Sequence, residues 1–319
     1  MIQAVFMGSP EIAVPSLRVL ADHQGVTIRG VFAQPDRPAG RGRKTQPCAV
    51  RAAADELGLA VYTPERVRET EALATLEELA PDLIIVCAYG QILPRPLLDL
   101  PPLGCFNLHF SLLPRWRGAS PVQAAILAGD RKTGVSLQRM VMELDAGPLV
   151  AYSPPVPLDA GETSQSLSEK LALVSADLLR QTLPILMEGN PPQREQDARA
   201  VTHCRIIPKS AGEIHWAQES ALEIERKTRA YSPWPGCFSR IGGKRLGILG
   251  VDLCGDAESA QLPEGKPGVL LAEGVVWTKA GALRLNAVKP EGKGAMDLKA
   301  FLNGQPHLIG EPFTDTRQA

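Results

Sequence analysis

Two polar side chains near the middle of the chain could act together on one substrate atom. Asn107 and His109 lie two residues apart in the segment NLHFSLLPRWRG (107–118). On an extended strand such residues share one face, and the carboxyl end of a parallel strand opens on the ligand crevice of an α/β fold. An amide donor and an imidazole would then face one reacting group. A hydrogen-bonded histidine at a strand end, without a catalytic role, also fits this pattern.

A carboxylate further along the chain could complete this group. Asp145 lies in the segment MELDAG (142–147), a turn-like connection between two predicted strands. A carboxylate there could hold an imidazole in place or relay its proton. We therefore expect Asn107, His109 and Asp145 to be the catalytic residues. The alternative is that Asp145 only caps the turn before Gly147.

Four positive charges follow the second predicted strand, in the segment QPDRPAGRGRK (34–44). They are Arg37, Arg41, Arg43 and Lys44. The glycines permit a close approach to a ligand, and the arginine fork suits bidentate contact with phosphate. The loop is either a clamp for a phosphate backbone or a solvated surface loop.

Several common motifs are absent from the sequence. The first strand-to-helix turn, FMGSPE (6–11), lacks G-x-G-x-x-G, and the chain contains neither a P-loop nor G-x-S-x-G. The six cysteines form no C-x-x-C pair, so we expect reduced thiols and no metal. Neither a signal peptide nor a run of about 18 apolar residues occurs, which predicts a cytoplasmic protein without a membrane partner.

Short apolar runs alternate with helical patterns through the first two hundred residues. Strands are expected at 4–7, 26–34, 61, 82–87, 105–109, 134–140 and 148–152, and helices around 17–20, at 50–57, from 69 and at 163–188. This alternation predicts an α/β domain with a Rossmann-like, doubly wound and mostly parallel sheet. Such a sheet would present Asn107 and His109 at the end of a strand.

The chain of 319 residues is long for one core, so we expect two domains. Residues 190–208 are polar, contain prolines and lack a sustained period, which is typical of a linker. Beyond them, a helix expected at 217–231 precedes short runs interrupted by glycine and proline at 237–241, 245–253, 268–271, 274–278 and 282–288. This spacing is typical of a small β-barrel. The expected organisation is a catalytic domain (1–189), a linker (190–208) and a barrel domain (209–319).

Five segments carry a more specific pattern. They are FMGSPEIAVPSL (6–17), QPDRPAGRGRK (34–44), CAYGQILP (87–94), NLHFSLLPRWRGASP (107–121) and TGVSLQRMVMELDAG (133–147). Together they resemble the 10-formyltetrahydrofolate-dependent formyltransferase superfamily. The segments IIPKSAGEIHW (206–216) and RAYSPWPGCFSRIGGKRL (229–246) are similar to the second domain of its tRNA-dependent members. The resemblance implies the formyltransferase fold followed by a small C-terminal OB-like β-barrel.

The resemblance also implies a function in one-carbon metabolism and protein biosynthesis. The formyl group of 10-formyltetrahydrofolate would pass to the free α-amino group of methionyl initiator tRNA, as translation initiation requires. The folate and the tRNA would be the partners of a monomeric enzyme that uses no metal. Asn107 and a protonated His109 would hydrogen-bond the charge on the formyl oxygen, and Asp145 would orient the imidazole.

The flat pterin ring of a folate calls for an apolar pocket with backbone groups at its rim. The expected folate-binding residues are Val86, Ala88, Tyr89, Gly90, Ile92, Leu93, Ser111, Leu112, Leu113 and Pro114. The expected tRNA-binding residues are Arg37, Arg41, Arg43, Lys44, Lys209, Lys244 and Arg245. Two alternatives remain: a formyltransferase that acts on an amino sugar nucleotide, and a folate- or RNA-binding protein without catalysis.

Overall fold

The structure is a computed structural model that describes residues 1–39, 44–263 and 265–315, without the side chains of 38, 39, 44, 45 and 256. Arg41 and Arg43 of the basic loop lie outside the described residues. The chain divides into two compact units. The first comprises residues 1–121, 132–157 and 168–205, and the second comprises 122–131, 158–167 and 206–319. The domain boundaries expected from the sequence stay predictions.

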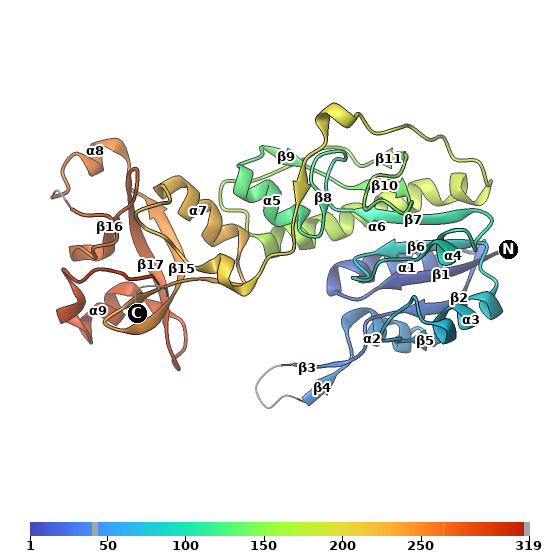
Figure 1. Cartoon of the computed structure of the whole chain (residues 1–319), viewed down its shortest axis with the longest axis horizontal. Coiled ribbons are helices and arrows are strands. Elements are labelled where there is room, and N and C mark those ends of the chain that lie inside the picture. The colour runs from blue at the N-terminus through green and yellow to red at the C-terminus, as the bar shows by residue number, and fades with distance from the viewer. Residues whose placement is uncertain (40–43, 264, 316–319) are drawn as a thin grey trace. The chain divides into compact units, whose positions relative to one another are not determined.

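A seven-stranded sheet forms the centre of the first unit (Figure 1), in the order β11-β10-β7-β6-β1-β2-β5. Its strands are β1 (Ile2–Gly8), β2 (Val26–Phe32), β5 (Val61–Tyr62), β6 (Leu83–Cys87), β7 (Gly104–His109), β10 (Ser136–Arg139) and β11 (Leu149–Tyr152). The strands from β7 to β5 are parallel, whereas β10 and β11 are antiparallel to their neighbours. The predicted Rossmann-like, mostly parallel sheet is confirmed.

The order of the strands reverses beside β1, and this reversal indicates where a ligand binds. The chain passes from β1 to β2 and β5, and then returns to β6 on the other side of β1. Every residue of β6 is buried, as expected for a parallel strand covered on both faces. In an open α/β sheet, ligands bind at the carboxyl ends of the strands where the order reverses.

Helices flank this sheet. They are α1 (Val14–Asp22), α2 (Ala49–Glu56), α3 (Thr70–Leu79), α4 (Arg95–Leu98) and α6 (Ser164–Met187). The helix α1 contacts α2, and α3 contacts α4. The hydroxyl oxygens of Ser16 and Ser175 lie 3.0 Å apart, so α6 packs against α1.

Shorter elements complete the first part of the chain. They are α5 (Pro121–Ala128), β3 (Arg37–Ala39), β4 (Lys44–Gln46), β8 (Arg117–Gly118), β9 (Lys132–Thr133), β12 (Val156–Pro157), β13 (His203–Cys204) and the 3-10 helices η1 (Glu11–Ala13) and η2 (Ala198–Ala200). The strands β3 and β4 form the arms of a hairpin that extends away from α2 (Figure 1). Of the basic residues expected in the loop, Arg37 belongs to β3 and Lys44 to β4.

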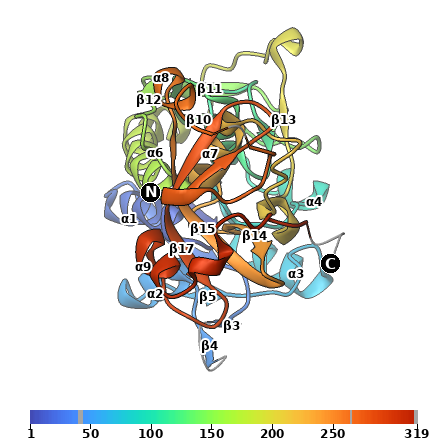
Figure 2. The same ribbon diagram turned by 90° about the vertical axis from the view of Figure 1, so that its left-hand side faces the viewer.

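The second unit contains a curled antiparallel sheet in the order β14-β15-β17-β16, with β18 paired to β17. Its elements are β14 (Cys237–Ile241), β15 (Lys244–Leu253), β16 (Val275–Trp277), β17 (Ala282–Pro290), β18 (Met296–Asp297), α7 (Ala221–Ala230), α8 (Asp256–Ser259), α9 (Leu298–Asn303), η3 (Lys209–Gly212), η4 (Ala272–Gly274) and η5 (Pro306–Leu308). The helix α7 packs on β15, and α9 packs on β17 (Figure 2).

Isolated backbone bridges connect the two edges of this sheet. Leu270 pairs with Val276 of β16, Val269 pairs with Pro312, and Thr314 pairs with Arg240 of β14. The strand expected at 268–271 is therefore reduced to isolated bridges. The result is a half-barrel, which confirms the predicted C-terminal OB-like domain.

Candidate active site

The strand β7 and the turn after β10 bring the three predicted catalytic residues together. The Nδ1 atom of His109 lies 3.6 Å from Oδ1 of Asp145, and Nδ2 of Asn107 donates to the same oxygen at 3.4 Å. The side chains of His109 and Asp145 are only 6% and 7% exposed. The geometry therefore supports joint action of the three side chains.

The carboxylate of Asp145 accepts hydrogen bonds from several elements of the first unit. Nε2 of Gln138, on β10, donates to Oδ1 at 2.8 Å, and the backbone N–H of Gly118, on β8, donates to Oδ2 at 2.9 Å. These donors, like Asn107, lie outside the turn that contains Asp145. The side chain is thus directed at the end of β7, which disfavours the alternative that it only caps its own turn.

The backbone around Trp116 determines which nitrogen of His109 carries a proton. Nε2 of His109 lies 2.9 Å from the carbonyl oxygen of Trp116. A carbonyl oxygen only accepts, so Nε2 must donate and keep its proton. Nδ1 is therefore the nitrogen that can gain or lose a proton, and it faces the carboxylate of Asp145.

The loop that supplies this carbonyl is held by the segment expected as a linker. The strand β13 pairs with β8 in parallel, so His203 and Cys204 lie beside Arg117 and Gly118. Gly118 has a φ of 118°, and a Cβ atom there would lie 2.0 Å from the carbonyl oxygen of Cys204. Only glycine fits this close approach of two strands.

A small cavity of about 90 Å³ opens beside Asp145. Its lining residues are Gln91, Ile92, Leu93, Gln138, Met140, Val141, Met142, Leu144, Asp145 and Gly147. Most of these side chains are apolar, and a few amide and carboxylate groups lie among them. Ile92, Met142 and Leu144 are 76%, 56% and 61% exposed, so a bound ligand could bury them.

Two of the expected folate-binding residues, Ile92 and Leu93, line this cavity. The others lie outside its lining: Val86, Ala88, Tyr89, Gly90, Ser111, Leu112, Leu113 and Pro114. Val86 and Tyr89 pack in the core of the first unit.

The segment 111–114 makes contacts within its own loop and with β10. The hydroxyl of Ser111 donates to the carbonyl of Arg115 at 2.6 Å, and the N–H of Leu113 donates to Oγ of Ser136 at 2.9 Å. Residues 91–93 form one wall of the cavity and residues 138–147 form the other. The second group was not among the residues predicted to bind the folate. The apolar residues on both sides of Glu143 were a signal for it, because apolar side chains of a turn rarely lack a partner.

The basic residues expected in the hairpin are only partly described. Arg37 is exposed and forms an ion pair of 2.7 Å with Glu65, which is exposed as well. Lys44 begins β4, and only its backbone is described. The phosphate clamp formed by these charges stays a prediction.

Basic residues of the second unit gather on the hairpin of β14 and β15. Lys244 and Arg245 are exposed, and the guanidinium of Arg245 lies 4.0 Å from the ring centre of Phe238. Arg240 is paired with Arg245 across the two strands, so both side chains lie on one face. Neither Arg240 nor Phe238 was among the predicted tRNA-binding residues. Lys209 lies on η3 and is also exposed.

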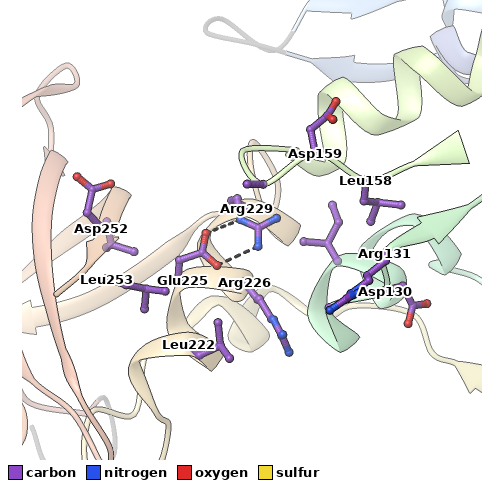
Figure 3. A pocket seen from close by; sticks show the side chains of 14 residues that line it. Asp130, Arg131, Leu158, Asp159, Leu222, Glu225, Arg226, Arg229, Asp252 and Leu253 are labelled. Atoms are coloured by element: carbon purple, nitrogen blue, oxygen red, sulfur yellow. Dashed lines mark hydrogen bonds and ion pairs between the residues drawn. The ribbon is translucent and has the colours of Figure 1, made fainter. Parts of the chain in front are cut away.

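A larger cavity, of about 420 Å³, lies in the second unit (Figure 3). Its lining residues are Ile126, Gly129, Asp130, Arg131, Leu158, Asp159, Ala160, Leu222, Glu225, Arg226, Arg229, Val251, Asp252 and Leu253. Arg229 and Glu225 of α7 are bound to each other by two hydrogen bonds. None of the expected site residues lines this cavity, and its charges are of both signs.

Within the described part of the chain, no group of three or more histidine, cysteine, aspartate or glutamate residues could hold a metal ion. Among the same residues, no helix is both long and apolar enough to cross a membrane. The six cysteines are free thiols.

Comparisons with known proteins identify the family. The chain matches the Formyl transferase family over residues 3–183 and the Formyl transferase, C-terminal domain family over residues 206–306. The methionyl-tRNA formyltransferase of Halorhodospira halophila is 42% identical over 314 residues, which cover 97% of this chain and 98% of that protein. The methionyl-tRNA formyltransferase of Dehalococcoides mccartyi is 41% identical over 314 residues, 97% of each chain.

Solved structures share the fold at low sequence identity. HypX from Aquifex aeolicus in complex with tetrahydrofolic acid has a TM-score of 0.61 and 18% identity, over 94% of this chain and 47% of that one. The N-formyltransferase from Helicobacter canadensis, in complex with folinic acid and dTDP-3-aminofucose, has a TM-score of 0.63 and 16% identity, over 89% and 99%. With two family domains and relatives that match it over nearly its whole length, the chain belongs to the methionyl-tRNA formyltransferases.

Proposed function

We propose that this enzyme transfers the formyl group of 10-formyltetrahydrofolate to the free α-amino group of methionyl initiator tRNA. The product is N-formylmethionyl-tRNA, which serves translation initiation. The observation that carries the proposal is the meeting of Asn107, His109 and Asp145 beside an apolar cavity, in a chain of this family.

The transfer requires the neutral amine to attack the formyl carbon, which places negative charge on the formyl oxygen. One N–H of the Asn107 amide donates to Asp145, and the second can donate to this oxygen. Removing one such donor typically lowers the rate by ~10²- to 10³-fold. Asn107 therefore stabilises the charge that develops during the reaction.

The amine must then lose a proton while N10 of the folate gains one, as the bond between N10 and the formyl carbon breaks. We assign both steps to His109. Because Nε2 stays bound to the Trp116 carbonyl, Nδ1 takes the proton from the amine and returns one to N10. Asp145 stabilises the charged imidazole from 3.6 Å.

The cavity beside Asp145 is the proposed site for the pterin ring of the folate. Its apolar walls suit a flat heterocycle, and the amides of Gln91 and Gln138 offer groups that can bind the polar edge of the ring. Val86, Ala88, Tyr89, Gly90 and the segment 111–114 lie outside this lining and stay proposed contacts of the folate.

The tRNA is proposed to contact two basic regions. One is the predicted basic loop with Arg37, Arg41, Arg43 and Lys44, and the other consists of Lys209, Lys244 and Arg245. In the second region Phe238 adds an aromatic ring and Arg240 a further charge on the same hairpin. Basic side chains interleaved with an aromatic ring are typical of surfaces that bind single-stranded nucleic acid.

We further propose that the enzyme works as a monomer in the cytoplasm and without a metal. The six free thiols agree with a reducing compartment. Sedimentation of the purified protein would test the monomeric state, and a second species at twice the mass would contradict it.

The test of this function is transfer of labelled formyl from 10-formyltetrahydrofolate to three acceptors in parallel. The acceptors are methionyl initiator tRNA, a UDP-amino sugar and glycinamide ribonucleotide. We expect formylation of the tRNA alone, and loss of this activity in His109→Ala. Formylation of the amino sugar alone would overturn the proposed acceptor.

Substitution of Arg245 by alanine tests the tRNA surface. Loss of one phosphate contact should weaken tRNA binding and lower its salt dependence by about one charge, with folate affinity unchanged. Arg95→Ala is a suitable control, because Arg95 is an exposed arginine on α4 outside both basic regions. An equal effect of both substitutions would show that the hairpin of β14 and β15 does not belong to the tRNA-binding surface.

A further inference from the structure

Gln196 lies in the segment expected as a linker, yet its amide contacts the turn that carries Asp145. Nε2 donates to the carbonyl oxygens of Asp145 and Gly147, at 2.8 Å each. Oε1 accepts a hydrogen bond of 3.0 Å from Nε of Arg117. One side chain thus connects the turn at 145–147 with the loop that contains β8.

The turn at 145–147 has an unfavourable backbone conformation at Asp145 and a close backbone contact at Gly147, so further hydrogen bonds are needed to hold it in place. Asp145 has a φ of 53°, a left-handed conformation that is uncommon for a residue with a side chain. At Gly147 a Cβ atom would lie 1.7 Å from the carbonyl oxygen of Arg139, so the turn closely approaches the end of β10. The amide of Gln196 binds the carbonyls on both sides of Ala146 and so fixes the conformation between these points.

The same segment also supports the other half of the catalytic group. The hydroxyl of Thr202 accepts a hydrogen bond of 2.8 Å from the N–H of Trp116, and its carbonyl accepts one of 2.9 Å from the N–H of Arg117. The carbonyl of Trp116 in turn binds Nε2 of His109. Residues 196–204 therefore contact the supports of both Asp145 and His109.

We propose that Gln196 is a positioning residue, which holds the carboxylate of Asp145 in register with Nδ1 of His109. The inference rests on the proposed function, because it concerns the same catalytic group. Loss of the amide would let the turn relax and move the carboxylate away from the imidazole. A displacement of about 1 Å at a reacting group can lower the rate by about 10²-fold.

The test compares Gln196→Met with Gln193→Met in the full-length chain. Methionine keeps the length of the side chain and removes all four hydrogen bonds of the amide, including the one of 3.5 Å that Nε2 donates to Oε1 of Gln138. Gln193 is exposed on the same segment. The measurements are kcat, the KM for each substrate and the midpoint of thermal unfolding. We expect kcat to fall by about 10²-fold in Gln196→Met, with both KM values within about threefold of wild type.

Gln196→Glu is the second variant. It keeps the shape of the side chain, so it provides a test if Gln196→Met does not fold. A carboxylate cannot donate to the two carbonyls, so kcat should fall at least as far as in Gln196→Met. A kcat within threefold of wild type in either folded variant overturns the inference, and so does an equal loss in Gln193→Met. Failure of the wild type to formylate methionyl-tRNA would instead overturn the proposed function, which keeps the two failures distinct.

Discussion

Replacing Asp145 by asparagine keeps the shape of the side chain and removes its charge. The carboxylate is 7% exposed and lies 3.6 Å from Nδ1 of His109. Two unit charges at this distance attract by about 5 kcal/mol at an effective dielectric constant of ~20. This attraction develops only when the imidazole takes the proton of the amine, so it stabilises the transition state more than the ground state.

The expected result is a loss of kcat of about 10³-fold, since each factor of ten corresponds to about 1.4 kcal/mol. The loss should occur with little change in either KM. An asparagine also places an N–H₂ group where the carboxylate accepts from Gln138, Asn107 or Gly118. One mismatched donor of this kind costs about 1–3 kcal/mol of stability, which thermal unfolding would report.

The assay is single-turnover formyl transfer with enzyme in excess over labelled methionyl-tRNA, which isolates the chemical step. Asp99→Asn is the matched control, because Asp99 is an exposed carboxylate that pairs with Arg95 on α4. A rate for Asp145→Asn within tenfold of wild type, in a folded protein, would refute the role of this charge.

Gly118→Ala should lower both kcat and the unfolding temperature, because its Cβ would lie 2.0 Å from the carbonyl oxygen of Cys204. Gly161→Ala, where a Cβ meets nothing within 4 Å, is the control, and equal effects of both would contradict this reasoning. Ile92→Ser should raise the KM for the folate by about tenfold at unchanged kcat, since burial of this side chain is worth about 1.5 kcal/mol; an unchanged KM would remove Ile92 from the folate site. Burial raises the pKa of the Cys87 thiol from 9.0 to about 12, so the folded chain keeps a proton that the unfolded chain releases. The free energy of unfolding should therefore fall as the pH rises from 9.0 towards 12, and Cys87→Ala should flatten this slope by up to about 1.4 kcal/mol per pH unit. Denaturant unfolding between about pH 8 and 10.5 measures the slope, and equal slopes for both proteins would show that this thiol is not responsible.

The long elements of the chain could be predicted because local periodicity determines them. The buried strand expected at 82–87 is β6 (Leu83–Cys87), and the helix expected at 163–188 is α6 (Ser164–Met187). The two-residue strands β8 and β13 have no period of their own. They form because residues far apart in the sequence meet, which no local pattern reports.

The same distinction applies to the candidate site. Asn107 and His109 could be predicted from their spacing on one strand. The position of Asp145 beside them depends on the pairing of β10 with β7, and the support from Gln196 depends on a contact across 51 residues. The contact of Gln196 becomes visible only when the fold is known, because a glutamine in a polar segment is ordinary in sequence.

The division of the chain into interleaved segments limits how the enzyme can be taken apart. A fragment that ends at residue 189 would lack β13 and Gln196, so β8 and the Asp145 turn would lose their partners. The shortest catalytic fragment to express should end at Arg205. A chimera that exchanges the second unit with that of a relative must respect five junctions, because residues 122–131 and 158–167 belong to that unit as well. A single fusion after Arg205 would exchange only residues 206–319 and leave the other two segments of the second unit from the original chain.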